Sequence, residues 1–176
     1  MGTALEAIAK RSSTRSYTNE PLTEAEIRQI VTAGLQAPTA ANRQEVHFTV
    51  VKGDNPILAE LENEKNALRG IEAPAHNFYY EAPLVIMLSA DSCNHWGSLD
   101  AGIAVENMSL AAEDLGLGSL IIGCIYDAFR GEKRDYFEKG FGFPEGWQYE
   151  IALAVGRKAA GKEPHTYDEE KLVSYL

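Results

Sequence analysis

A short stretch near the N-terminus gathers side chains that suit an anion. Residues 10–17, Lys-Arg-Ser-Ser-Thr-Arg-Ser-Tyr, contain three cations, four Ser or Thr hydroxyls and no acid. A guanidinium offers a fixed fork of donors that matches phosphate oxygens, and hydroxyls add shorter donors around it. The stretch therefore suits a phosphate or a similar anion. A short polar loop after a helix is also often plain solvated surface, and this stretch alone does not separate the two interpretations.

The composition of the whole chain makes this basic stretch a local exception. The 176 residues, 45% of them hydrophobic, suffice for one globular domain spanning 1–176. The 26 acids outnumber the 16 bases, which argues against nucleic acid or an anionic membrane as a partner, because both attract positive surfaces. The sequence shows no apolar run of membrane-spanning length, and residues 1–6 lack the pattern of a signal peptide. We therefore expect a cytoplasmic protein.

Motifs of several common enzyme classes are incomplete in this chain. Cys93 and Cys124 lie far apart and indicate reduced thiols, and the four histidines are scattered, so we expect no metal site. The glycines within 116–123 miss the spacing of a dinucleotide fingerprint and run from helix to strand, the reverse of that motif. Residues 156–162 match seven positions of a phosphate-binding P-loop, but Glu163 replaces the Ser or Thr that binds magnesium.

The spacing of apolar residues predicts helices that alternate with strands. Thr3 and Thr23, each followed three positions later by Glu, are capping boxes that open two helices, the second ending near Pro38. Further helices are predicted at 56–69, 100–115 and 127–139, and strands at 46–51, 82–88, 119–125 and 149–155. This order indicates an α/β or α+β sandwich. The aromatic loop 73–80 either covers the core or lines a pocket, and the apolar tail 172–176 must fold back or dock on a partner chain.

Five sequence landmarks, taken in order, resemble the nitroreductase family of flavoproteins. Residues 11–17 match the opening signature of that family, which runs basic, any, Ser, any, basic, any, aromatic. The other landmarks are residues 37–44, residues 82–86, the helix from Asp100 to its Leu-Gly-Leu-Gly end, and the strand that ends at Gly156. Together they cover nearly the whole chain and favour the anion-site interpretation of the basic stretch.

The resemblance implies an α+β fold with a mixed sheet flanked by helices, in an intertwined homodimer that binds FMN at two subunit interfaces. By position, Arg11 would hold the FMN phosphate, with Ser12 and Ser13 nearby. Arg15 would reach the ribityl chain or the N1 and O2 edge of the flavin, where a cation stabilises the charge gained on reduction. The family usually has a second basic residue at the position of Ser12, so phosphate binding here would be weaker or completed from elsewhere.

The same resemblance assigns three further segments to the cofactor. The residues that would approach the flavin ring from the partner subunit are Pro38, Thr39, Ala40 and Asn42. The backbone at Ile122 and Gly123 would face flavin N5 and offer an N–H group. Beyond the last strand, Lys162 or His165 would close on the phosphate.

The implied reaction carries hydride from NADH or NADPH through flavin N5 to a small-molecule acceptor such as a nitroaromatic or a quinone. No catalytic acid or base is assigned, because the chemistry lies at N5 and the protein supplies position, electrostatics and access. A second hypothesis is an FMN-binding carrier or sensor without turnover, which the short length and the altered phosphate shell suggest. A third is a specialised relative that uses reduced flavin for dehalogenation or flavin cleavage, because fold alone does not determine function.

Overall fold

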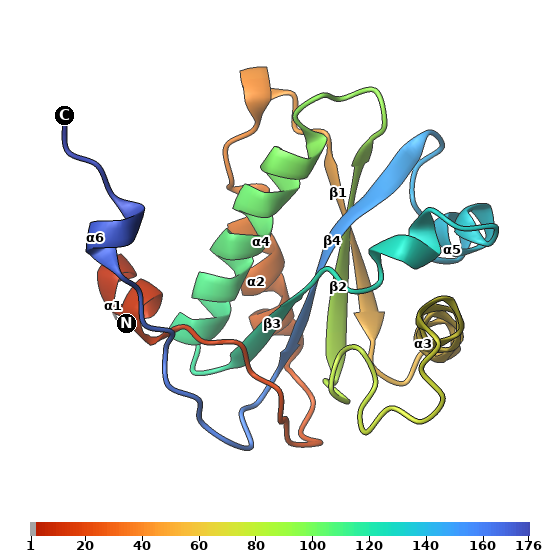
Figure 1. The fold of residues 1–176 in the computed structure, drawn as a ribbon, viewed down its shortest axis with the longest axis horizontal. Coiled ribbons are helices and arrows are strands. Elements are labelled where there is room, and N and C mark those ends of the chain that lie inside the picture. The colour runs from red at the N-terminus through yellow and green to blue at the C-terminus, as the bar shows by residue number, and fades with distance from the viewer. Residues whose placement is uncertain (1–2) are drawn as a thin grey trace.

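The fold is a four-stranded sheet with helices on both faces, seen in a computed structural model that describes residues 3–176 (Figure 1). Met1 and Gly2, which begin the segment considered for a signal peptide, lie outside the described residues. The strands are β1 (Val46–Lys52), β2 (Leu84–Asp91), β3 (Gly118–Ile122) and β4 (Trp147–Gly156). They pair antiparallel in the order β1-β2-β4-β3. The predicted α+β fold is confirmed; among the described residues the parallel component is an isolated bridge between Ser13 and Ser119.

The helices form a layer on each side of this sheet (Figure 1). On one side α2 (Glu24–Leu35) and α4 (Gly97–Asp114) cover the sheet, and α1 (Ala4–Lys10) packs on α4. On the other side lie α3 (Pro56–Arg69), α5 (Arg134–Gly140) and the 3-10 turn η2 (Tyr126–Phe129). The turn η1 (Ala40–Asn42) precedes β1, and α6 (Glu169–Leu172) lies near the C-terminus. The capping boxes predicted at Thr3 and Thr23 are both confirmed.

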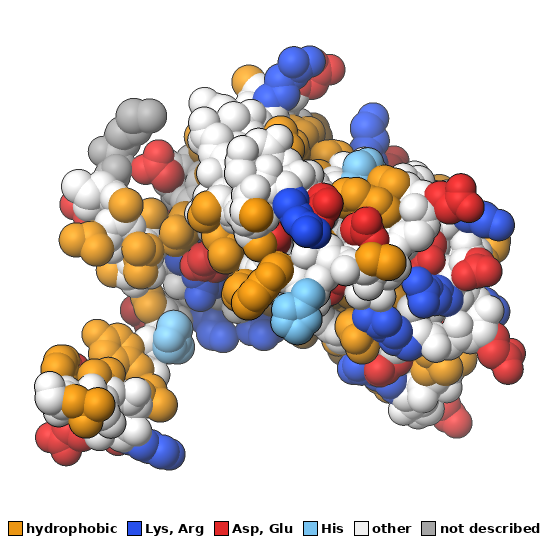
Figure 2. All heavy atoms as spheres, turned by 90° about the horizontal axis from the view of Figure 1, so that it is seen from above, with side chains coloured by type: hydrophobic (Ala, Val, Ile, Leu, Met, Phe, Trp, Pro, Cys, Tyr) orange, Lys and Arg blue, Asp and Glu red, His pale blue; other side chains and the backbone are white. Residues whose placement is uncertain are grey.

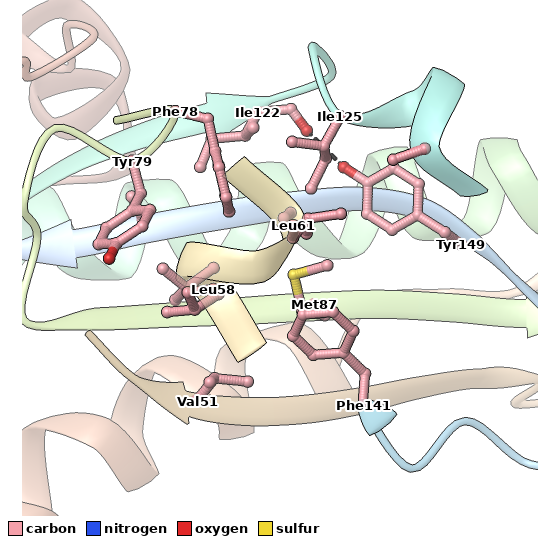
Figure 3. Close-up of a cluster of buried hydrophobic side chains, with 14 of the residues drawn as sticks. Val51, Leu58, Leu61, Phe78, Tyr79, Met87, Ile122, Ile125, Phe141 and Tyr149 are labelled. Carbon is pink, nitrogen blue, oxygen red and sulfur yellow. Dashed lines mark hydrogen bonds between the residues drawn. The ribbon is translucent and has the colours of Figure 1, made fainter. Parts of the chain in front are cut away.

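Two hydrophobic clusters fill the space between the layers. Because β2 is central, it is buried on both faces, as its continuous apolar run predicts. The cluster beneath α3 and α5 is rich in aromatic side chains, among them Phe129, whose ring stacks on Tyr149 with centroids 4.5 Å apart. Phe78 and Tyr79 of the aromatic loop belong to this cluster (Figure 3). For these two residues, the interpretation that the loop covers the core is confirmed.

Two predicted elements differ from the structure just after β3. The strand predicted at 119–125 ends at Ile122, because the chain turns there and Tyr126 N donates to Gly123 O at 3.1 Å. The helix predicted at 127–139 is wrong: η2 and α5 are separate elements. Phe129 and Phe137 are buried in the aromatic cluster, whereas Tyr136 is 54% exposed, so the three do not form one buried helical face.

The C-terminal tail does not fold back onto its own chain. Its large apolar side chains are exposed: Tyr167, Leu172, Val173, Tyr175 and Leu176. In Figure 2 the segment that carries α6 stands clear of the main body at the lower left. Of the two outcomes expected for the tail, docking on a partner chain is the one that stays a prediction. No helix among residues 3–176 is long and apolar enough to cross a membrane.

Candidate functional site

The basic stretch at residues 10–17, the basic loop, lies along the outer edge of β3. Thr14 N donates to Ser119 O at 2.9 Å, and Ser13 forms the parallel bridge with Ser119. Thr14 is buried, and a Cβ atom at Gly118 would come within 2.5 Å of its Oγ1 atom. Glycine at 118 is therefore what allows the loop to approach the strand this closely. Further along, Arg15 on the loop is exposed.

The other side of the basic loop is tied to the segment that follows β4. Three main-chain contacts make this connection: the antiparallel bridge of Tyr17 with Lys158, Thr18 N to Arg157 O at 3.0 Å, and Ala159 N to Ser16 O at 3.0 Å. In addition, Ser12 Oγ donates to Lys162 O at 2.8 Å, although 150 positions separate the two residues. The fold therefore brings residues 157–162, including the predicted Lys162, beside the predicted phosphate loop. His165, the alternative, is exposed in the tail.

Several cations around the loop already have an acidic partner. The pairs are Arg11 Nε with Glu106 Oε1 at 3.5 Å, Lys158 Nζ with Glu113 Oε2 at 2.6 Å, and Arg157 Nε with Glu20 Oε1 at 2.7 Å. Arg157 also pairs with Glu26, at 3.1 Å. The sequence reasoning did not anticipate the acids on α4, because residues 106 and 113 are far from the loop in the chain. The local charge at the loop is consequently less positive than residues 10–17 suggest.

Tyr80, the last residue of the aromatic loop 73–80, is a neighbour of the basic loop. The guanidinium carbon of Arg15 lies 5.9 Å from the centroid of the Tyr80 ring, within the range of a cation–π contact. Tyr80 has a φ of 53°, and Asn77 stabilises this turn by accepting hydrogen bonds from Tyr79 N and Glu81 N. Asn77 thus uses its side-chain oxygen inside its own loop.

The same loop is fastened to α3 by a buried charge pair. Glu62 Oε2 accepts a hydrogen bond from Phe78 N at 2.8 Å, and Glu62 Oε1 pairs with Lys65 Nζ at 2.9 Å. Both charged residues are buried, so each needs the other to offset its lost hydration. This pair fixes the backbone two residues before Tyr80.

The chain just beyond β3 has exposed backbone at Gly123. Ile122 is buried, and its carbonyl accepts from Tyr149 Oη at 2.7 Å; burial raises the pKa of Tyr149 well above its ordinary value, so the hydroxyl stays a donor. Gly123 is exposed, and a Cβ atom there would meet only Ile151 Cδ1, at 3.9 Å. The exposed Gly123 backbone, with the partly exposed Ile121, therefore forms an open surface that suits a flat ligand.

The predicted residues Pro38, Thr39, Ala40 and Asn42 are not brought to this surface. Their segment, drawn in orange between α2 and β1, lies at the opposite end of the molecule from the basic loop (Figure 1). It is anchored by Asp100, whose carboxylate accepts from Ala40 N at 3.1 and 3.2 Å. Ala41, Asn42 and Gln44 all have positive φ, between 53° and 57°. Within one chain the structure thus brings Lys162 to the basic loop, has Gly123 at the end of the strand that the loop borders, and leaves 38–42 apart.

Comparison with known proteins shows the family of the chain. A sequence model described as the Nitroreductase family matches residues 8–157. The chain belongs to the nitroreductase family. The matched range contains the basic loop, the 38–42 segment and Gly123, and it ends before Lys162 and His165.

Solved and curated relatives share most of the fold. The chain is similar to a nitroreductase with bound FMN from Desulfitobacterium hafniense, with a TM-score of 0.88 and 31% identity over 100% of this chain and 99% of that chain. It is 29% identical to an FMN reductase (NADPH) from Bacillus subtilis, over 93% of this chain and 70% of that protein. It is also 29% identical to an FMN reductase [NAD(P)H] from Bacillus subtilis, over 78% of this chain but only 59% of that longer protein.

Proposed function

We propose that this chain is an FMN-dependent oxidoreductase that takes hydride from NADH or NADPH and reduces a small-molecule acceptor such as a nitroaromatic or a quinone. One observation carries the proposal: the basic loop is bridged to β3 at Ser119, and the exposed backbone of Gly123 directly follows the end of that strand, in a chain of the nitroreductase family. When bound, FMN supplies the hydride chemistry at its N5 atom.

The residues of the basic loop fit the phosphate end of FMN. Arg11 stands at the start of the loop with its side chain 18% exposed, so part of its guanidinium is open to a ligand. Ser13 is half-buried beside β3, and Ser12 donates its hydroxyl hydrogen to Lys162 O. Because this bond brings the main chain of Lys162 to the loop, Lys162 is better placed than His165 to act as the second cation.

Arg15 and Gly123 fit the ring end of a flavin. The exposed Arg15 guanidinium lies 5.9 Å from the Tyr80 ring and supplies a positive charge, which favours the more negative, reduced form of a bound flavin. Gly123 has no side chain, so a planar group can approach its backbone closely, and a backbone N–H needs no reorganisation to donate there. No acid or base side chain is given a catalytic role.

A second copy of the chain completes this proposed site. The segment holding Pro38, Thr39, Ala40 and Asn42 cannot reach the basic loop of its own chain, since the two lie at opposite ends of the molecule (Figure 1). We therefore assign these residues to the flavin site of a partner subunit in a homodimer. The exposed apolar side chains of α1 and the tail, such as Leu5 and Leu172, supply surface for that contact.

The decisive experiment is an anaerobic titration of the FMN-loaded protein with NADH and then NADPH, followed by the visible absorbance of the flavin. We expect bleaching by at least one nicotinamide and recovery of the absorbance when a nitroaromatic or a quinone is added. A bound flavin that neither nicotinamide reduces would favour the carrier or sensor hypothesis. Failure to bind FMN would overturn both.

A further inference from the structure

Glu106 places a carboxylate against the arginine that we assign to the phosphate. Its Oε1 atom lies 3.5 Å from Arg11 Nε, and its Oε2 atom accepts a hydrogen bond from Ser109 Oγ at 2.8 Å. Ser109 is fully buried on the same helix, one turn further on. The Ser109 hydroxyl also lies 3.0 Å from the Glu106 main-chain oxygen, so its single hydrogen bonds to one of these two acceptors at a time. The Glu106 carboxylate is 44% exposed and lies beside Arg11, so it is a neighbour of the proposed phosphate site.

A carboxylate and a phosphate make the same demand on a guanidinium, since both accept its N–H donors. A phosphate that binds Arg11 must share these donors with Glu106 and also lie close to its negative charge. Of the cations that follow β4, Lys158 already pairs with Glu113 at 2.6 Å, and Lys162, the proposed second cation, offsets part of this repulsion.

We propose that Glu106 competes with the phosphate for Arg11 and so keeps the phosphate's contribution to flavin affinity small. This inference rests on the proposed function and names the ligand class of the same site: flavins with or without the 5′-phosphate. FMN and riboflavin bind with similar affinity, because recognition comes mainly from the ring surface at Gly123 and from Arg15.

If Glu106 instead orients Arg11 for the phosphate, its removal has the opposite effect on FMN affinity. If the carboxylate only oriented Arg11 toward the phosphate, its removal would leave the arginine free to move and would weaken FMN binding. If it competes, its removal frees donors and removes a like charge, and FMN binds more tightly. The sign of the change in FMN affinity therefore separates the two roles.

The test uses the full-length protein freed of flavin, titrated with FMN and with riboflavin while flavin fluorescence is followed. Glu106→Gln keeps the size of the side chain and removes its charge. We expect a gain of about tenfold in FMN affinity, with riboflavin affinity unchanged, and a smaller gain at high salt, which screens exposed charges. The control is Glu145→Gln, which removes the same charge from an exposed turn before β4 and leaves both affinities unchanged.

Three results would overturn the inference: unchanged FMN affinity, weaker FMN binding, or equal gains for FMN and riboflavin. A calorimetric titration with inorganic phosphate separates this inference from the proposed function. If neither flavin binds, the proposed function fails. Tighter phosphate binding by Glu106→Gln than by the unmodified chain would still support the competition, and equal phosphate binding would refute it.

Discussion

The basic loop and the 38–42 segment, both assigned to the flavin, are held in place by different means. The basic loop is fixed on both sides by main-chain contacts, with β3 through Ser119 and with residues 157–159. The 38–42 segment depends on a side chain, the buried carboxylate of Asp100, and passes through successive residues with positive φ. Main-chain pairing on both sides thus holds the basic loop. The 38–42 segment is held by a hydrogen bond to the Asp100 carboxylate and contains a strained turn.

This difference bears on which part of the proposed site forms within one subunit and which part needs a second subunit. Main-chain pairing makes the basic loop part of the sheet, so its geometry follows from the folding of a single subunit. The 38–42 segment projects away from that loop, and its own main-chain hydrogen bonds, from Asn42 N to Thr39 O and from Arg43 N to Ala40 O, stay within the turn. We infer that the phosphate half of the proposed site forms within each chain, and that the contribution of 38–42 depends on assembly.

The largest effect should come from Gly118→Ala, which tests the contact between the basic loop and β3. The new Cβ atom would meet Thr14 Oγ1 at 2.5 Å and Cγ2 at 2.7 Å, so strand or loop must move. We expect a loss of about 2–3 kcal/mol in the free energy of unfolding, measured by urea denaturation, and weaker FMN binding. Gly102→Ala on α4, where a Cβ atom meets nothing within 4 Å, is the control and should not destabilise. Equal stability of the two variants would show that the loop is not tightly packed.

A somewhat smaller effect is expected from Asp100→Ala, which removes the anchor of the 38–42 segment. Ala40 N loses a charged acceptor, and we expect a loss of about 1.5–2 kcal/mol in the free energy of unfolding. Amide hydrogen exchange should speed up in residues 38–44 and stay unchanged in the basic loop. Asp100→Asn retains an acceptor oxygen and should show a weaker version of both changes. Faster exchange in both segments would contradict their independence.

Acid should loosen the outer side of the basic loop through Glu26, which pairs with Arg157. Hydrogen bonds from the Thr23 backbone, and then from its hydroxyl and from Arg157, hold the pKa of Glu26 below its ordinary value of 4.5. A lowered pKa in the folded state stabilises the fold above the ordinary value, and this contribution is lost as the pH falls through the lowered one. We expect roughly 1 kcal/mol at neutral pH.

The measurement for Glu26 is the melting temperature of the unmodified chain and of Glu26→Gln across pH 3 to 7. The difference between them should be constant near neutrality and should shrink only below the ordinary pKa. Glu24→Gln removes a charge from the same helical turn without breaking these hydrogen bonds and serves as the control. If the difference in melting temperature persists at pH 3, it arises from the packing of the Glu26 side chain and not from its charge.

The smallest effect should come from Ala41→Gly in the strained turn. Ala41 has a φ of 53°, which costs a residue with a side chain about 1 kcal/mol, and glycine relieves this strain at some cost in chain entropy. We expect a net gain of about 0.5 kcal/mol in the free energy of unfolding. Ala33→Gly inside α2 is the matched control and should lose about 1 kcal/mol. If both substitutions lower the free energy of unfolding, backbone strain is not the factor that decides stability at residue 41.

Elements with strong local signals could be predicted closely. The helix predicted at 56–69 has the bounds Pro56–Arg69, because Asn55 caps its start, Pro56 suits the first turn and Gly70 takes the left-handed conformation at its end. The helix predicted at 127–139 failed because Phe129 and Phe137 follow helical spacing for another reason. Both are held in the aromatic cluster, which no local pattern describes.

By itself the sequence determined the family, the cationic stretch, the capped helices and the buried central strand, since each depends on neighbouring residues or on patterns of short period. Only the tertiary structure decided which groups face the basic loop. Glu106 and Tyr80 are brought there by helix packing and by a turn with positive φ. A hydrogen bond across 150 positions brings Lys162 there, a choice that the sequence leaves open between Lys162 and His165. Such contacts depend on how elements pack in space, so the residues of the loop do not reveal which distant side chains lie beside it.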